Sequence, residues 1–153
     1  MIEIKNLTKK FNKFTALNQV NIRFNDGHSV ALIGPNGCGK TTLIKCILGL
    51  NVVEDGDILV NNESVKEHYL YRKNIGYMPQ IGRYPENMTI AQTIQMIKDT
   101  RKVSESELDT ELLEAFELKS IFDKKMRTLS GGNYPKSKCC FGFFIQSWDY
   151  NFG

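Results

Sequence analysis

The fold of this chain is decided by the stretch Val30-Ala31-Leu32-Ile33-Gly34-Pro35-Asn36-Gly37-Cys38-Gly39-Lys40-Thr41-Thr42. It fits the pattern G-x-x-x-x-G-K-[ST], in which an apolar strand leads into a glycine-rich turn and then into a helix. Glycines let such a turn direct its backbone N–H groups at a phosphate, and the helix N-terminus also favours an anion. We therefore expect a buried strand at 30–33, a phosphate-binding loop at 34–41 and a helix at 41–50.

Two side chains carry the chemistry of this predicted loop. The ammonium group of Lys40 would bind the β- and γ-phosphates, and the hydroxyl group of Thr41 would be a ligand of Mg²⁺. The alternative is a glycine-rich turn with an incidental Lys-Thr, which the flanking strand and helix patterns disfavour. The residues predicted to contact the nucleotide here are Gly34, Pro35, Asn36, Gly37, Cys38, Gly39, Lys40, Thr41 and Thr42.

The composition is that of an ordinary globular domain. With 153 residues, of which 41% are hydrophobic, the chain has the length and the apolar content of one domain. The net charge of +3 is scattered, so no nucleic-acid partner is predicted. The first residues do not resemble a signal peptide, and no run of about 18 apolar residues predicts a membrane span. The four cysteines form no C-x-x-C pair, which suits a reducing cytoplasm.

Alternating apolar residues predict an antiparallel pair of strands at 1–7 and 17–24. Phe11 and Phe14 lie in the basic turn between them, where they could stack on a nucleotide base or belong to the core. A short strand is predicted within 52–60, a short helix at 69–73, and a strand at 75–78. Pro79 stops the last of these, which places Gln80 at a strand end, where ligands bind in open α/β sheets.

Residues 89–127 change to helical periodicity. Thr89 is expected to cap a helix that carries Ile90, Ile94 and Ile97 on one face. Ser104 and Glu107 have the spacing of a capping box for a second helix. Farther along, Ser130-Gly131-Gly132 stands at a prospective helix start and could form a second small anion site, although this tripeptide alone is a weak signal.

These motifs together resemble the nucleotide-binding domain of ATP-binding cassette (ABC) transporters over residues 1–132. The resemblance implies an α/β fold with a P-loop NTPase core, an N-terminal antiparallel β part and a helical subdomain at about 85–130. It implies that Phe11 stacks on adenine and that Lys40 and Gln80 serve catalysis. Gln80 would reach Mg²⁺ and the attacking water, while Ser130, Gly131 and Gly132 would close over ATP held by an opposite subunit.

The resemblance also implies partners and a location. ATP and Mg²⁺ would be bound, and the chain would work with a membrane-spanning transporter subunit and a second nucleotide-binding subunit at the cytoplasmic face of the cell membrane. Residues 75–89 look closest to the ATPases of copper or nitrous-oxide-reductase maturation exporters. The alternative functions are a non-hydrolysing, regulatory nucleotide-binding fragment and another phosphate-loop enzyme, such as a small-molecule kinase.

The resemblance stops at residue 132, where Asn133-Tyr134-Pro135 replaces the family's continuation. Residues 133–153 hold seven of the sixteen aromatic residues and show no Walker B strand, catalytic Glu or switch His. The sequence therefore predicts an incomplete central sheet, weak nucleotide binding and little or no hydrolysis.

A reading-frame shift is one explanation of this tail. Codons for Asn133 onward, read one base later, can encode I-I-Q-K-V-S-A-V-L-G-F-L-F-N-P-G-I-I-I-L and then Asp or Glu, which restores the family's helix and strand. The alternative is a divergent tail that folds onto the domain. Its replacement strand would then contain Phe141, Phe143, Phe144 and Ile145.

Overall fold

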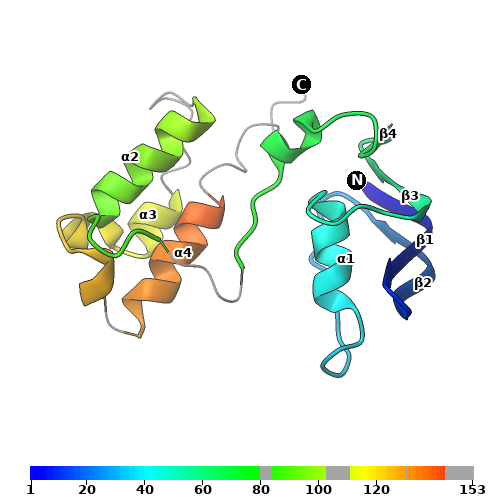
Figure 1. Cartoon of the computed structure of the whole chain (residues 1–153). Helices are drawn as coiled ribbons and strands as arrows, with labels where there is room; N and C mark the ends of the chain where they lie inside the picture. The colour runs from blue at the N-terminus through cyan, green and yellow to red at the C-terminus, as the bar shows by residue number, and fades with distance from the viewer. Residues whose placement is uncertain (80–83, 103–110, 130, 144–153) are drawn as a thin grey trace. The chain divides into compact units, whose positions relative to one another are not determined.

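The computed structural model describes residues 1–79, 84–102, 111–129 and 131–143 (Figure 1). The chain divides into two compact units, Met1–Arg72 and Lys73–Gly153, and each unit has a hydrophobic core of its own. In the part of the chain that is described, no helix is both long enough and apolar enough to cross a bilayer.

Unit Met1–Arg72 is built on a four-stranded antiparallel sheet. Its strands are β1 (Ile2–Phe11), β2 (Phe14–Phe24), β3 (Asp55–Val60) and β4 (Glu63–Ser64), in the order β2-β1-β3-β4. The predicted antiparallel pair is therefore confirmed, and the predicted strand within 52–60 is β3. Both β1 and β2 extend farther toward their shared turn than the apolar alternation indicated.

An irregularity in β1 and β2 explains this difference. Asn6 and Gln19 have left-handed backbone angles (φ 49° and 48°), and the register of the pair shifts between Ile4 and Leu7. The side chains of Asn6 and Asn21 stabilise the irregularity, since the Asn6 N–H donates to Asn21 Oδ1 (2.9 Å) and Asn21 Nδ2 donates to Asn6 Oδ1 (3.0 Å). Such a bulge breaks the two-residue period on which the sequence prediction depends.

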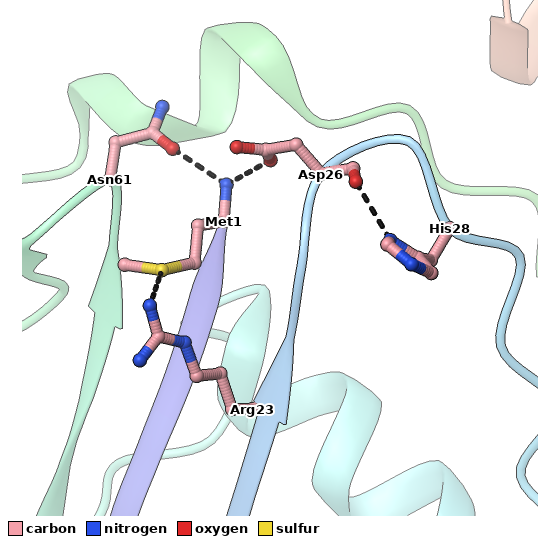
Figure 2. A network of polar contacts seen from close by, with 5 residues as sticks. All are labelled: Met1, Arg23, Asp26, His28 and Asn61. Carbon is pink, nitrogen blue, oxygen red and sulfur yellow. Dashed lines mark hydrogen bonds and ion pairs between the residues drawn. The ribbon is translucent and has the colours of Figure 1, made fainter.

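Polar contacts join the start of β1 to the chain segments that follow β2 and β3 (Figure 2). The ammonium group of Met1 contacts the carboxylate of Asp26 and donates to Asn61 Oδ1 at 2.9 Å. Arg23 donates to the sulfur of Met1 (3.0 Å), and His28 Nδ1 lies 2.9 Å from the Asp26 carbonyl oxygen (Figure 2). These contacts fix one end of the sheet.

Helix α1 (Lys40–Ile47) packs against this sheet (Figure 1). Its buried residues Leu43 and Cys46 share a core cluster with residues of β1, β2 and β3, namely Ile4, Leu7, Leu17 and Ile58. The predicted helix at 41–50 is thus confirmed but ends earlier. Gly49 adopts a left-handed conformation (φ 63°), as is common just after a helix C-terminus.

Two predicted strands are absent from the described residues. Residues 30–33 form no strand, and Val30, Leu32 and Ile33 are 57%, 36% and 93% exposed. Residues 75–78 form no strand either. The prediction of strands at these two places is wrong, because an apolar segment becomes a strand only when a neighbouring strand pairs with its N–H and C=O groups. The incomplete central sheet that the sequence predicted is consistent with this result.

The short helix predicted at 69–73 is confirmed as the 3₁₀ helix η1 (Leu70–Asn74). In unit Lys73–Gly153 the described residues form helices joined by turns and irregular segments, with one isolated β-bridge between Thr89 and Lys125. The unit contains α2 (Ile90–Arg101), α3 (Glu111–Ala115), η3 (Leu118–Ile121), η4 (Met126–Thr128) and α4 (Asn133–Phe143).

Thr89 caps α2, as predicted from the sequence. Its hydroxyl accepts the Gln92 N–H (3.1 Å), and Gln92 Oε1 accepts the Thr89 N–H (2.9 Å). Ile90 and Ile94 are buried in the core of the unit, and Ile97 packs against that core. The capping box predicted at Ser104 and Glu107 lies outside the described residues.

Helix α4 is the beginning of the segment that departs from the family pattern. Pro135 is its third residue and so lies in the first turn, where a proline is tolerated because its missing N–H would have no partner within the helix. Cys140 and Phe141 are buried in the core, and the Phe141 ring packs edge-on against Tyr84 at 4.8 Å. A replacement strand that includes Phe141 and Phe143 is therefore wrong. Phe144 and Ile145 lie outside the described residues, and the domain boundary at residue 132 stays a prediction.

Candidate phosphate-binding site

The loop at 34–39 turns sharply before α1. Gly37 and Gly39 have left-handed angles (φ 84° and 95°), which an L side chain rarely adopts. The Cys38 N–H reaches the Pro35 carbonyl oxygen at 3.4 Å, and the Cys38 side chain lies over Gly34, where a Cβ would be 2.7 Å from its sulfur. The backbone conformation thus favours glycine at residues 37 and 39, whereas a Cβ at residue 34 would need the Cys38 side chain to move.

Lys40 folds back onto this loop. Its Nζ donates hydrogen bonds to the carbonyl oxygens of Gly34 (2.7 Å) and Pro35 (2.8 Å) and lies 3.5 Å from Cys38 Sγ. The positive charge is therefore held at the loop by neutral acceptors, and no carboxylate among the described residues pairs with it. An anion that enters the loop would meet an ammonium group whose charge is not neutralised.

The first turn of α1 supplies further donors. Its N-cap, Gly39, has no side chain to accept a hydrogen bond, and among the described residues the N–H groups of Lys40 and Thr41 have no acceptor. Unpaired N–H groups at a helix N-terminus bind phosphate readily. Thr41 is exposed at the same turn, where its hydroxyl could ligate Mg²⁺. Since Mg²⁺ is usually held by few protein ligands together with phosphate oxygens, this donor set fits Mg²⁺-bound nucleotide.

Phe11 and Phe14 close the turn between β1 and β2, where they are paired across the hairpin. They are 46% and 62% exposed, so the alternative in which both are core residues is wrong. The same hairpin contacts the phosphate loop, because a Cβ on Gly39 would lie 2.7 Å from the Ala16 carbonyl oxygen. The structure thus brings the predicted base-stacking hairpin and the predicted phosphate loop together in one unit.

The remaining predicted site residues belong to the other unit or are not described. Gln80 and Ser130 lie outside the described residues. Gly131 and Gly132 are exposed directly before α4, with no atom within 4 Å of a Cβ placed on either. Their predicted roles therefore stay predictions.

Sequence reasoning missed an ion pair next to the hairpin turn. Lys9 is 8% exposed, and its Nζ lies 2.5 Å from Glu54 Oε1 and 5.0 Å from the centre of the Phe11 ring. The hydrogen bond from Lys9 holds the pKa of the Glu54 carboxyl below its usual range. No local pattern of residues signals this pair, because Lys9 and Glu54 are 45 positions apart.

Comparisons with known proteins agree with this geometry. The family model described as "ABC transporter" matches residues 17–140. A sulfate/thiosulfate import ATP-binding protein, CysA of Pseudomonas putida, is 36% identical over an alignment of 138 positions, which covers 86% of this chain and 42% of that protein. The chain thus spans less than half the length of that relative.

Solved structures give the same answer. One described as the ATP-binding subunit of an ABC transporter superposes with a TM-score of 0.84 at 28% identity, over 94% of this chain and 62% of that one. Another, the ADP conformation of an ATP-binding cassette, gives a TM-score of 0.79 at 25% identity, over 94% of this chain and 64% of that one.

The narrower likeness of residues 75–89 to copper or nitrous-oxide-reductase maturation exporters is not supported, because the similar curated relatives at 33% to 36% identity carry import in their names. The match over most of the chain and the superposed cassettes, which have the α/β fold of P-loop NTPases, leave one conclusion: the chain belongs to the ABC transporter family.

Proposed function

We propose that this chain binds ATP together with Mg²⁺ as part of the ATP-binding subunit of an ABC transporter. One observation carries the proposal, namely that Lys40 and the unpaired N–H groups of the α1 first turn converge on the loop at 34–39 without a neutralising carboxylate. Such a site favours a polyphosphate, because each phosphate oxygen gains a charge-assisted hydrogen bond.

Different residues would bind the phosphates, the metal and the base of the nucleotide. Lys40 would leave the carbonyl oxygens of Gly34 and Pro35 and bind the β- and γ-phosphates, while residues 34–42 surround the phosphate chain. Thr41 would hold Mg²⁺, which would partly neutralise the negative charge on the phosphate oxygens when it is bound. The exposed Phe11 ring would stack on adenine, and Gln80 would complete the metal and water site.

The wider assembly is proposed from the family. Ser130, Gly131 and Gly132 would contact ATP held by a second nucleotide-binding subunit. A membrane-spanning subunit would carry the transported molecule, and this chain would then work at the cytoplasmic face of the membrane. Import as the direction of transport is supported by the names of the similar relatives, which are sulfate/thiosulfate import ATP-binding proteins. The family match favours this role over a regulatory fragment without transport activity.

Hydrolysis needs more than the phosphate loop. Phosphoryl transfer depends on positioning the water and stabilising charge on the γ-phosphate. Residues 1–153 include no Asp-Glu pair that ends an apolar strand and no His after the Ser-Gly-Gly motif. A polypeptide of these residues alone is therefore expected to hold ATP without turning it over at a rate typical of the family.

Calorimetric titration of the chain with Mg²⁺-ATP tests the proposal. We expect saturable binding that Lys40→Met weakens by about tenfold or more, since hydrogen bonds to charged groups contribute about 1.5–3 kcal/mol. Lys45→Met is the matched control, because Lys45 is exposed in the last turn of the same helix. Absence of binding by the unmodified chain, or equal affinity of the two variants, would contradict the proposal.

A further inference from the structure

Lys9 is the one charged side chain that is buried among the described residues. Burial of an ammonium group is unfavourable unless a partner compensates for its lost hydration. Glu54 is that partner, and its two oxygens bind neighbouring groups of β1. Oε1 accepts from Lys9 Nζ (2.5 Å), and Oε2 accepts from the backbone N–H of Lys10 (3.1 Å). Glu54 therefore fixes both the backbone and the ammonium group at this point of the strand.

The same ammonium group lies over an aromatic ring. Lys9 Nζ is 5.0 Å from the centre of the Phe11 ring, within the range of a cation–π interaction. Lys9 and Phe11 are two residues apart in β1, and this contact shows that their side chains meet on one side of the strand. One face of the Phe11 ring is thus occupied by Lys9, yet 46% of the residue remains exposed.

The strand that carries Lys9 and Phe11 also packs against the helix that follows the phosphate loop. Leu7 of β1 and Cys46 of α1 belong to the same core cluster. The ion pair thus lies on a strand that shares a core with the helix that begins at Lys40.

We propose that the Lys9–Glu54 ion pair positions the Phe11 ring for stacking on the base of the nucleotide. Lys9 and Glu54 are then positioning residues for the base, and the phosphate loop binds the phosphates without them. This inference rests on the proposed function, because it takes Phe11 as the ring that contacts adenine. It adds that base recognition depends on a buried charge behind the ring.

The test compares a ligand that has a base with one that has none. Binding of Mg²⁺-ATP and of inorganic tripolyphosphate is measured for the full chain, Lys9→Met, Lys9→Arg and Glu54→Gln. Lys9→Met and Glu54→Gln are expected to lower the affinity for ATP by about threefold to tenfold, the size of one cation–π contact, and to leave the affinity for tripolyphosphate unchanged. Lys9→Arg is expected to restore ATP binding, because a guanidinium group keeps the charge above the ring.

Two controls separate positioning from general electrostatics and from misfolding. Lys10→Met removes the same charge from an exposed neighbour and should change neither affinity. In a Phe11→Leu background, Lys9→Met should have no further effect on ATP binding, since its influence passes through the ring. If Lys9→Met does not fold, Glu54→Gln decides the question, because it keeps the shape of the side chain and removes only its charge.

The outcomes are distinct. An unmodified chain that binds neither ligand overturns the proposed function. If the unmodified chain binds both ligands, the variants decide this inference alone. It is overturned if the Lys9 or Glu54 variants keep full affinity for ATP, or if they lose affinity for ATP and tripolyphosphate equally. A nucleotide-free readout is the aromatic proton signals of Phe11 by NMR, which should shift in Lys9→Met and stay in place in Lys10→Met.

Discussion

The backbone of Gly39 lies directly against Ala16: a Cβ atom at residue 39 would be 2.7 Å from the Ala16 carbonyl oxygen and 2.9 Å from the Leu17 side chain. This contact joins the start of α1 to β2, the strand that follows the Phe11–Phe14 turn. The approach is possible only because residue 39 has no side chain. The close packing of the phosphate loop against the sheet therefore depends on glycine at residue 39.

We predict that Gly39→Ala destabilises the chain more than Gly27→Ala. Both glycines have left-handed angles (φ 95° and 71°), but a Cβ on Gly27 meets nothing within 4 Å. Gly27→Ala should therefore cost only the conformational term of about 1–2 kcal/mol, and Gly39→Ala should add the clash with Ala16. Urea unfolding followed by circular dichroism measures both values. Equal losses would mean that the loop can move away from β2 at no cost.

A second prediction concerns the cap of α2. Thr89→Ala removes the hydroxyl that accepts the Gln92 N–H and should lower the free energy of unfolding by about 1 kcal/mol. Thr89→Ser keeps the hydroxyl and serves as the control, with a change of at most a few tenths of a kcal/mol. Thermal denaturation of the two variants gives the comparison. A Ser variant as unstable as the Ala variant would assign the effect to the lost methyl group.

The phosphate loop and the Thr89 cap could be predicted because their signals are local. Gly37, Gly39 and Lys40 are close in sequence, and a cap needs only Thr89 and the residues of the next turn. The burial of Lys9 could not be predicted, because the bulge near Asn6 makes Leu7, Thr8 and Lys9 buried in succession. Alternation then no longer separates inner from outer residues.

The two missing strands at 30–33 and 75–78 have a different cause. Their apolar residues have the pattern of a strand, but a strand also needs a neighbouring strand to pair with, and a local pattern does not contain that neighbour. The C-terminal end of α1 was also predicted too late. The apolar pattern continues to Leu50, but the helix ends at Ile47, before Gly49. Local sequence thus predicted the elements well where hydrogen bonds are made within a few residues.

A third prediction concerns pH. The hydrogen bond from Lys9 lowers the pKa of Glu54 from its usual 4.5, so Glu54 is ionised more readily in the folded chain than in the unfolded chain. Its contribution to stability is therefore full above pH 4.5 and is lost as the pH falls through the lower, folded-state pKa. Unfolding free energies of the unmodified chain and Glu54→Gln should converge on acidification. A constant difference between them down to about pH 3 would contradict the ion pair.

A fourth prediction concerns the cysteines. Cys38 is exposed in the phosphate loop, whereas Cys46 is fully buried and burial raises the pKa of its thiol. A maleimide should therefore label Cys38 in the folded chain and reach Cys46 only in denaturant, because thiolate content and access govern alkylation. Peptide mass spectrometry after timed labelling gives both rates. Early labelling of Cys46 would show that α1 separates readily from the sheet.

The origin of the tail has its own test. We propose that residues 133–153 arise from a reading-frame shift after a domain that ends at residue 132. The nucleotide sequence of the gene across codon 133 should then encode, one base later, the family's helix and an apolar strand ending in Asp or Glu. A shifted frame without that helix and strand would favour a divergent tail that packs through Cys140 and Phe141, as α4 does.

The exposed apolar segment at 30–33 has a practical consequence for anyone who purifies this chain. Val30 and Ile33 present large side chains to solvent on a stretch without strand pairing, which attracts both proteases and other copies of the same stretch. A protease that cuts beside large apolar residues should nick the chain there first. Such a cut would separate the β1–β2 hairpin from α1 and the phosphate loop, so an intact band on a gel is the first quality control for any ATP-binding experiment.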